Sequence, residues 1–303
     1  MDIRSKIILI AGPTASGKSS FAISIAKKIN GEIINADSMQ VYKELKILTA
    51  RPKKKDQKNI KHHLYGIRSV KKKFSTGEWL KLTVKKIKEI QKKNKIPILV
   101  GGTGLYFKSI TEGLVKLPYI PMRFRNKIRL LQKTTGQKKF YQKLIKFDPL
   151  IKNQFNSNDV QRTIRAYEIK KYTKKSITAW FKKTKILFNP NNFIKLYIDF
   201  PRDELVLRIK KRVDNMFKNG AILEVSRFQK LKVKSQNSSR KVIGIEEIGK
   251  YLKGEIAIEE AKERIFIKTR QYAKRQSTWA RGQMIVWQKI DPKNLSITLK
   301  KLK

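Results

Sequence analysis

The stretch Gly12-Pro13-Thr14-Ala15-Ser16-Gly17-Lys18-Ser19 decides the fold of this 303-residue chain. It fits the pattern G-x-x-x-x-G-K-[ST] at every required position, and it lies between an apolar run at 6–11 and a segment with helical apolar spacing at 19–29. In such a loop the glycines let several backbone N–H groups point into one concavity. The following helix N-terminus, the charge of Lys18 and the Mg²⁺-binding hydroxyl of Ser19 complete an anion site. The motif therefore predicts that this loop, called the P-loop below, binds a di- or triphosphate.

The segments around the P-loop alternate between strand and helix patterns. Short apolar runs predict strands at 6–11, 32–36, 64–67, 96–100, 193–200 and 284–290. Helical spacing predicts helices at 19–29, 76–94, 105–111, 203–231, 245–252 and 256–281. Such alternation is typical of βαβ units with a parallel sheet. We therefore predict an α/β fold with a P-loop parallel-sheet core, similar to that of the P-loop NTPases.

The pattern changes in the middle of the chain. Residues 114–190 show helical periodicity without a strand candidate, and they end in a turn cluster at 189–192. An all-helical insertion explains this change, so we predict a core domain of residues 1–113 and 191–303 and an insertion domain of residues 114–190. The polar segment 232–241 is expected to be mobile.

Composition excludes several kinds of protein. There is no cysteine, which excludes disulfide scaffolds, thiolate metal sites and cysteine nucleophiles, and two histidines do not make a three-histidine metal site. No apolar run reaches the ~18 residues of a membrane span, so we expect a cytoplasmic protein. The formal charge of +49, with 72 Lys and Arg against 23 Asp and Glu, indicates either a polyanionic partner or a solvated lysine coat.

The acids near the P-loop bear on its chemistry. An NTP hydrolase places an Asp after a neighbouring strand, but the 96–100 strand is followed by Gly-Gly-Thr-Gly at 101–104. Asp37 follows the second strand, and Asp199 follows an apolar run near the end of the strand predicted at 193–200. Because the carboxyl ends of parallel strands face one crevice, we expect Asp37 and Thr103 to meet the P-loop there. Asp37 could then accept a proton from a nucleophile, although a turn-forming aspartate is an alternative.

Further motifs follow the P-loop along the chain. They are NADSMQVYK, TARP, HHL, PILVGGTGLYFKSITEGL, NDVQRTIRAYEI, an R-I-x-x-R-x-x-x-M run at 208–216, and YAKRQSTWAR. Together with the P-loop, they resemble the tRNA dimethylallyltransferases, also called tRNA isopentenyltransferases, from residue 7 to about residue 282. The resemblance implies transfer of a dimethylallyl group from dimethylallyl diphosphate to N6 of the adenosine 3′ of the anticodon, with release of diphosphate. The P-loop would then hold a leaving group, which fits the missing hydrolase acid.

The resemblance also implies roles for single residues. Asp37 would be the general base for the N6 amine, and Thr103 would hydrogen-bond near the reacting centre. Arg212 would neutralise the departing diphosphate. Lys18 would be a further catalytic residue, which holds the diphosphate together with the rest of the P-loop and with Mg²⁺ bound by Ser19. The residues implied to contact tRNA are Asp37, Ser38, Met39, Gln40, Thr103, Arg125, Gln161, Arg162, Thr163, Ile164 and Arg165.

Two other functions stay open at this point. A nucleotide-type kinase shares the P-loop and the sheet, and it would transfer phosphate from ATP without RNA. A non-catalytic RNA-binding protein would use the P-loop for backbone phosphates. The sequence leaves open whether ATP also occupies the P-loop. We expect a monomer whose partners are the tRNA anticodon stem-loop and dimethylallyl diphosphate, with no membrane partner.

Overall fold

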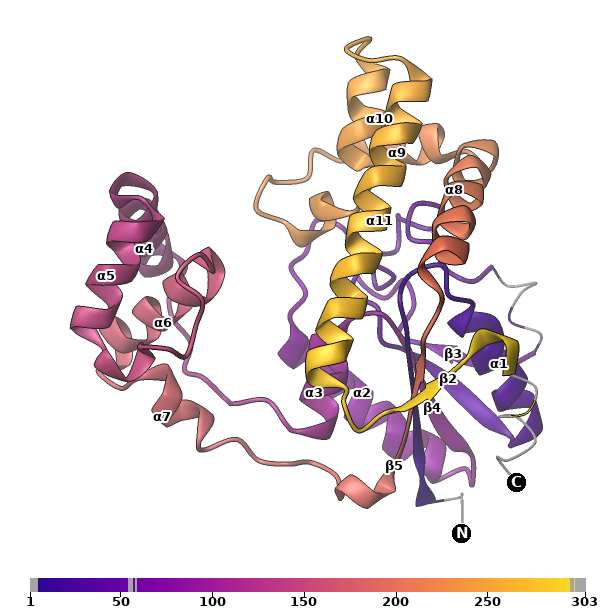
Figure 1. The fold of residues 1–303 in the computed structure, drawn as a ribbon, viewed down its shortest axis with the longest axis horizontal. Coiled ribbons are helices and arrows are strands. Elements are labelled where there is room, and N and C mark those ends of the chain that lie inside the picture. The colour runs from indigo at the N-terminus through magenta and orange to yellow at the C-terminus, as the bar shows by residue number, and fades with distance from the viewer. Residues whose placement is uncertain (1–4, 54–56, 58, 295–296, 298–303) are drawn as a thin grey trace. The chain divides into compact units, whose positions relative to one another are not determined.

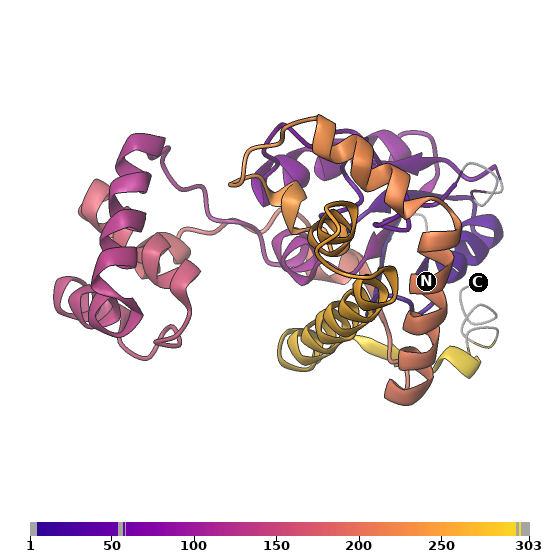
Figure 2. The same cartoon turned by 90° about the horizontal axis from the view of Figure 1, so that it is seen from above.

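The computed structural model describes residues 5–53, 57, 59–294 and 297. The chain divides into two compact units, one of residues 112–187 and the other of the segments on either side. The sequence places these boundaries at 114 and 190. Each unit is described by itself below (Figures 1 and 2).

The first unit is built on a six-stranded sheet with the order β3-β2-β4-β1-β5-β6. Every neighbouring pair of strands is parallel, so the predicted parallel α/β core is confirmed. The short strand predicted at 64–67 is wrong. It lies at 62–63 instead, because Leu64 has a φ of 64°, outside the extended region. The strands are β1 (Ile7–Ala11), β2 (Gly31–Asn35), β3 (His62–His63), β4 (Ile96–Gly101), β5 (Phe193–Ile198) and β6 (Gln288–Ile290).

Helices cover both faces of the sheet. Alternate strand residues point to opposite faces. Ile8 and Ile10 of β1 therefore share one buried cluster with Phe21 of α1, whereas Leu9 is buried on the other face. Figure 1 shows α1 on one side of the sheet and α2 and α3 on the other. The helices of this unit are α1 (Lys18–Lys28), α2 (Thr76–Gln91), α3 (Gly104–Thr111), α8 (Arg202–Lys218), α9 (Ala221–Lys230), α10 (Ile245–Leu252) and α11 (Ile258–Gln283).

Helices α8, α9 and α10 lie beyond the carboxyl ends of the strands, and the C-terminal end of α11 runs down beside α3 (Figure 1). The single helix predicted at 203–231 is two helices, which are separated at Gly220, a residue with a φ of 94°. The segment 232–241, predicted to be mobile, is anchored instead. The Asn237 side chain is buried there and donates to the carbonyls of Val70 and Lys71 at 3.1 and 2.9 Å.

The second unit is all-helical, and no strand occurs in residues 112–187, all of which the structure describes. Buried apolar residues such as Phe140, Leu144 and Ile169 form its own core. Over the described parts of both units, no helix is long and apolar enough to span a membrane. The α-helices of the second unit are α4 (Met122–Thr135), α5 (Gln137–Phe147), α6 (Val160–Thr173) and α7 (Ile177–Phe181).

Candidate active site

The P-loop joins β1 to α1 and has the backbone shape of an anion-binding loop. Ala15 and Gly17 have left-handed φ values of 65° and 84°, and the Ser16 N–H donates to the Pro13 carbonyl at 3.3 Å. Left-handed residues within such a turn direct successive N–H groups into one concavity. Helix α1 begins at Lys18 without a side-chain cap on its first turn. Its N–H groups and positive dipole end are therefore available to an anion.

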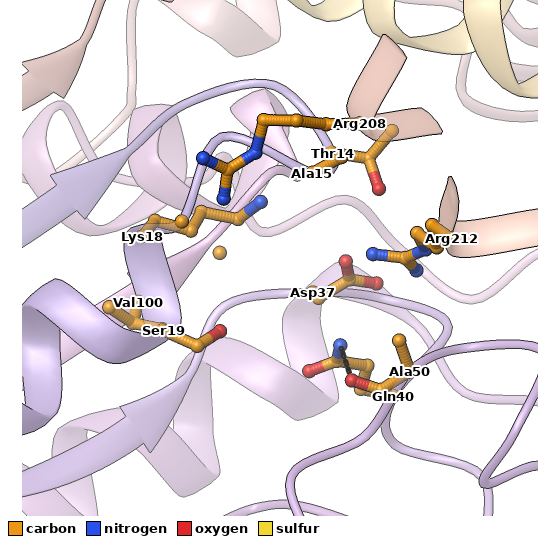
Figure 3. Close-up of a pocket in the computed structure, with 12 residues that line it drawn as sticks. Thr14, Ala15, Lys18, Ser19, Asp37, Gln40, Ala50, Val100, Arg208 and Arg212 are labelled. Atoms are coloured by element: carbon orange, nitrogen blue, oxygen red, sulfur yellow. Dashed lines mark hydrogen bonds between the residues drawn. The ribbon is translucent and has the colours of Figure 1, made fainter. Parts of the chain in front are cut away.

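A cavity of about 210 Å³ lies against the P-loop, the carboxyl end of β2 and helix α8. It brings together the predicted residues Lys18, Asp37 and Arg212 with a further cation, Arg208. Figure 3 shows the Asp37 carboxylate facing the Arg212 guanidinium. Three cations against one carboxylate suit a ligand with several negative charges. The other lining residues are Thr14, Ala15, Gly17, Ser19, Gln40, Ala50, Val100 and Gly101.

Two of these cations are partly buried, at a cost that an anion would offset. Burial lowers the pKa of Lys18 to about 8, even though the Asp37 charge raises it, and Arg212 lowers it further. Burial also lowers the pKa of Arg212. The Arg212 Nη2 donates to the Thr49 carbonyl at 3.4 Å, but its buried Nε has no hydrogen-bond partner among the described residues. A buried donor without a partner is costly, so the site favours an anionic ligand.

Asp37 is held in a hydrogen-bonded turn that follows β2. The Asn35 side chain accepts from the Asp37 N–H at 2.9 Å and donates to its carbonyl at 3.0 Å. The Asp37 Oδ1 accepts from the Met39 N–H at 2.9 Å, and its carboxylate also lines the cavity. Both interpretations of Asp37, as a base and as a turn former, therefore have a structural basis. Asp199, the other acid considered, lies outside this cavity, 4.0 Å from Lys289.

Thr103 does not line the cavity at the P-loop, called the phosphate cavity below, but lies beside it. Its Oγ1 accepts from the Ser38 N–H at 2.9 Å, and it lines an adjoining cavity of about 340 Å³ with Met39 and Trp279. The last residue of β4, Gly101, has no room for an acid, because a Cβ there would overlap the backbone of Ala36. The close approach of the residue after β2 to the end of β4 thus excludes an acid at position 101.

Two residues of this site were not predicted from the sequence. The Gln276 side chain accepts from the Thr14 N–H at 2.8 Å and donates to the Gly102 carbonyl at 2.9 Å, so α11 ties the P-loop to the end of β4. The one sequence feature that pointed to Gln276 was its place in the motif YAKRQSTWAR. Arg208 had a clearer signal, because it precedes Arg212 by four residues and both lie on one face of α8.

The remaining residues implied to contact tRNA belong to the second unit. Arg125 lies on α4, and the segment 161–165 forms the first turns of α6. Thr163 and Ile164 are buried in the core of the unit. The side chains of this segment that reach the surface are those of Gln161, Arg162 and Arg165.

Together, the fold and the cavity define a P-loop α/β protein whose P-loop cavity is lined by three cations and one carboxylate. Residues 40–283 match the model of a family described as IPP transferase. The chain is 64% identical to the tRNA dimethylallyltransferase of Pelagibacter ubique over 303 residues, all of this chain and 97% of that protein. It is 43% identical over 282 residues to the tRNA dimethylallyltransferase of Rickettsia massiliae, 93% of this chain and 78% of that protein. The chain belongs to the IPP transferase family.

Solved structures agree with this assignment. The full-length tRNA isopentenylpyrophosphate transferase of Bacillus halodurans is similar with a TM-score of 0.71 at 30% identity, over 98% of this chain and 95% of that chain. A eukaryotic dimethylallyltransferase acting on tRNA has a TM-score of 0.81 at 30% identity, over 96% of this chain and 75% of that chain. The resemblance and fold class predicted from the sequence are confirmed, and the chain is an enzyme of the transferase class.

Proposed function

We propose that this chain transfers a dimethylallyl group from dimethylallyl diphosphate to N6 of the adenosine just 3′ of the anticodon in tRNA, with release of diphosphate. The observation that carries the proposal is the single cavity that joins Lys18, Arg208 and Arg212 to Asp37. It combines cations suited to a leaving diphosphate with one carboxylate suited to an incoming amine. The relatives named tRNA dimethylallyltransferase support the same reaction.

In the reaction, a bond forms between N6 of the adenine and C1 of the prenyl group, and the bond from C1 to the diphosphate oxygen breaks. Negative charge then builds on the departing diphosphate. Lys18 of the P-loop and the two arginines of α8 stabilise this charge where it develops. The N6 amine loses one proton as it becomes substituted. Asp37 is the one acid among the described lining residues, so it accepts this proton.

Mg²⁺ fits the oxygen groups of this cavity. The Ser19 hydroxyl and the Asp37 carboxylate both line it, and oxygen is the ligand that Mg²⁺ prefers. The described residues contain no cluster of three His, Cys, Asp or Glu side chains that could hold a metal. Mg²⁺ commonly takes its remaining ligands from water and substrate phosphates. We therefore assign Ser19 as its protein ligand, where the ion would add positive charge against the diphosphate.

The RNA would be bound by surfaces of both units. In the first unit, residues 37–40 follow β2, and the adjoining cavity offers Met39 and Trp279 to an unstacked base. The target adenine has to leave its stack to reach Asp37, at a cost of a few kcal/mol that is smaller in a loop than in a duplex. In the second unit, Arg125 and the three surface residues of the segment 161–165, which are Gln161, Arg162 and Arg165, are proposed to contact the RNA, whereas the buried Thr163 and Ile164 are not. The monomeric state and the cytoplasmic location stay predictions.

A diphosphate-release assay tests this function against its two rivals. The protein is incubated with Mg²⁺ and with unmodified tRNA, dimethylallyl diphosphate or both, and a parallel reaction contains ATP in place of the prenyl donor. We expect diphosphate only when tRNA and the prenyl donor are both present. Consumption of ATP without diphosphate release from the prenyl donor would favour the kinase. Binding of tRNA with no release in any reaction would favour the RNA-binding protein.

A further inference from the structure

A single buried carboxylate in the second unit binds three arginines from two helices. Glu168 of α6 is fully buried, and its Oε2 accepts from the Arg125 Nε and the Arg165 Nη1, both at 3.0 Å. The Arg129 Nε lies 3.9 Å from the other carboxylate oxygen, Oε1. This buried oxygen has no hydrogen-bond partner within the described residues. Arg125 and Arg129 are four residues apart on α4, so they lie on the same face of that helix.

The charges of this cluster do not cancel. Three guanidinium groups against one carboxylate leave an excess of two positive charges, whereas one arginine would neutralise Glu168. Residues 112–187 contain 20 Lys and Arg and only 4 Asp and Glu, so one of the few acids of this unit holds three of its arginines. Like charges at short range repel, and an anionic ligand would relieve that repulsion. The three arginine side chains are 30–40% exposed and can reach such a ligand.

We infer that Arg125, Arg129 and Arg165 form one phosphate-binding site and that Glu168 is the positioning residue that sets its geometry. Arg125 and Arg129, which face Glu168 through Nε, keep both Nη groups for a phosphate oxygen pair. Arg165 meets Glu168 through Nη1 and keeps its Nη2 group for the same ligand. The shared anchor also restricts the side chains before binding, so less conformational entropy is lost. The inference rests on the proposed function, in which the ligand is a backbone phosphate of tRNA. Arg129 lies in none of the motifs that resemble the family.

Glu168→Gln separates positioning from net charge, because the two predict opposite signs. The amide removes one negative charge, so tRNA affinity would rise if charge alone governed binding. Under our inference the arginines lose their ionic anchor and meet an amide NH₂ donor instead. The tRNA affinity then falls, by about tenfold if the loss is worth one charge-assisted hydrogen bond.

The experiment measures binding of an unmodified tRNA transcript to the full chain at several salt concentrations, without prenyl donor. The variants are Arg129→Gln, Glu168→Gln and Arg123→Gln, a matched control on α4 whose exposed arginine lies outside the cluster. We expect Arg129→Gln to lower the affinity and to flatten the slope of log K against log salt by about one unit. A loss no larger than that of Arg123→Gln, or tighter binding by Glu168→Gln, would overturn the inference.

Two controls keep the result interpretable. Circular dichroism and thermal unfolding show whether each variant is folded. If Glu168→Gln does not fold, Arg129→Gln decides the matter, since it alters a side chain 40% exposed. Under steady-state turnover we expect both variants to raise the KM for tRNA at unchanged kcat, which a partly unfolded protein would not do. Wild-type protein that modifies tRNA while Arg129→Gln binds normally would refute this inference alone, whereas an inactive wild type with the expected binding pattern would refute the proposed function alone.

Discussion

Replacement of Asp37 by asparagine separates the two roles that this side chain has in the structure. The Asp37 Oδ1 accepts from the Met39 N–H at 2.9 Å, and an asparagine oxygen keeps that acceptor. The negative charge facing Arg212 is lost, together with the ability to take a proton (Figure 3). Asp37→Ala removes the turn hydrogen bond as well. The pair of variants therefore distinguishes a base from a turn former.

The expected effects differ in size. A general base contributes roughly 10²–10⁴-fold, so both variants should lower kcat by at least about 10²-fold, or about 2.7 kcal/mol in the activation free energy. The turn hydrogen bond contributes about 1 kcal/mol, so Asp37→Ala should be less stable to unfolding than Asp37→Asn by that amount. The affinity for tRNA should stay near the wild-type value in both variants.

Single-turnover prenylation rates at saturating enzyme and urea unfolding curves measure these effects. Asp199→Asn is the matched control, because Asp199 also follows a strand but lies outside the phosphate cavity, and it should react like wild type. A normal rate for Asp37→Asn with a slow rate for Asp37→Ala would refute the reasoning. The Asp37 side chain would then serve the turn alone.

Three further predictions concern the cations and the loops around the cavity. Lys18 has a pKa of about 8, so it loses its proton as the pH rises through 8. The affinity for diphosphate, measured by calorimetry, should therefore fall about tenfold between pH 7 and 9, and Lys18→Arg should abolish this pH dependence. An affinity of the wild-type protein that does not change with pH would contradict this prediction. Gln276→Ala breaks the two hydrogen bonds that tie α11 to the P-loop and to β4, and it should raise the KM for the prenyl donor roughly tenfold in diphosphate-release kinetics; an unchanged KM would show that the P-loop keeps its shape alone. Glu224 accepts from the backbone N–H groups of residues 46–48, so Glu224→Ala should lower the free energy of unfolding in urea by roughly 3 kcal/mol, and a loss below about 1 kcal/mol would mean that water replaces the carboxylate.

The parts of the fold that the sequence predicted depend on residues close together in the chain. The apolar runs of β1 and β4 and the apolar spacing of α1 are local patterns, and the structure confirms the two strands and the helix that they predicted. Local backbone geometry caused the misses, because apolar spacing does not report that Leu64 and Gly220 have positive φ values. The segment 232–241 was misjudged for another reason. Its polar composition says nothing about the buried bond from Asn237 to the Val70 carbonyl, 167 residues away.

The same distinction holds for the candidate site. Lys18, Asp37 and Arg212 were found from motifs, and the structure brings them into one cavity. The contacts of Gln276 and Glu224 were not predictable, since they bind backbone groups 262 and 176–178 residues away. Every residue has a backbone carbonyl and every residue except proline has a backbone N–H, so a bond to the backbone cannot be recognised from the residue type of the partner.

Mass spectrometry of the nucleosides from tRNA tests the central claim most directly. Unmodified tRNA is incubated with the protein, Mg²⁺ and dimethylallyl diphosphate, digested, and compared with a reaction that contains ATP alone. The account predicts an adenosine heavier by one dimethylallyl group, mapped to the position 3′ of the anticodon and absent from the ATP reaction. Adenosine of unchanged mass from a folded protein that binds the tRNA would contradict it.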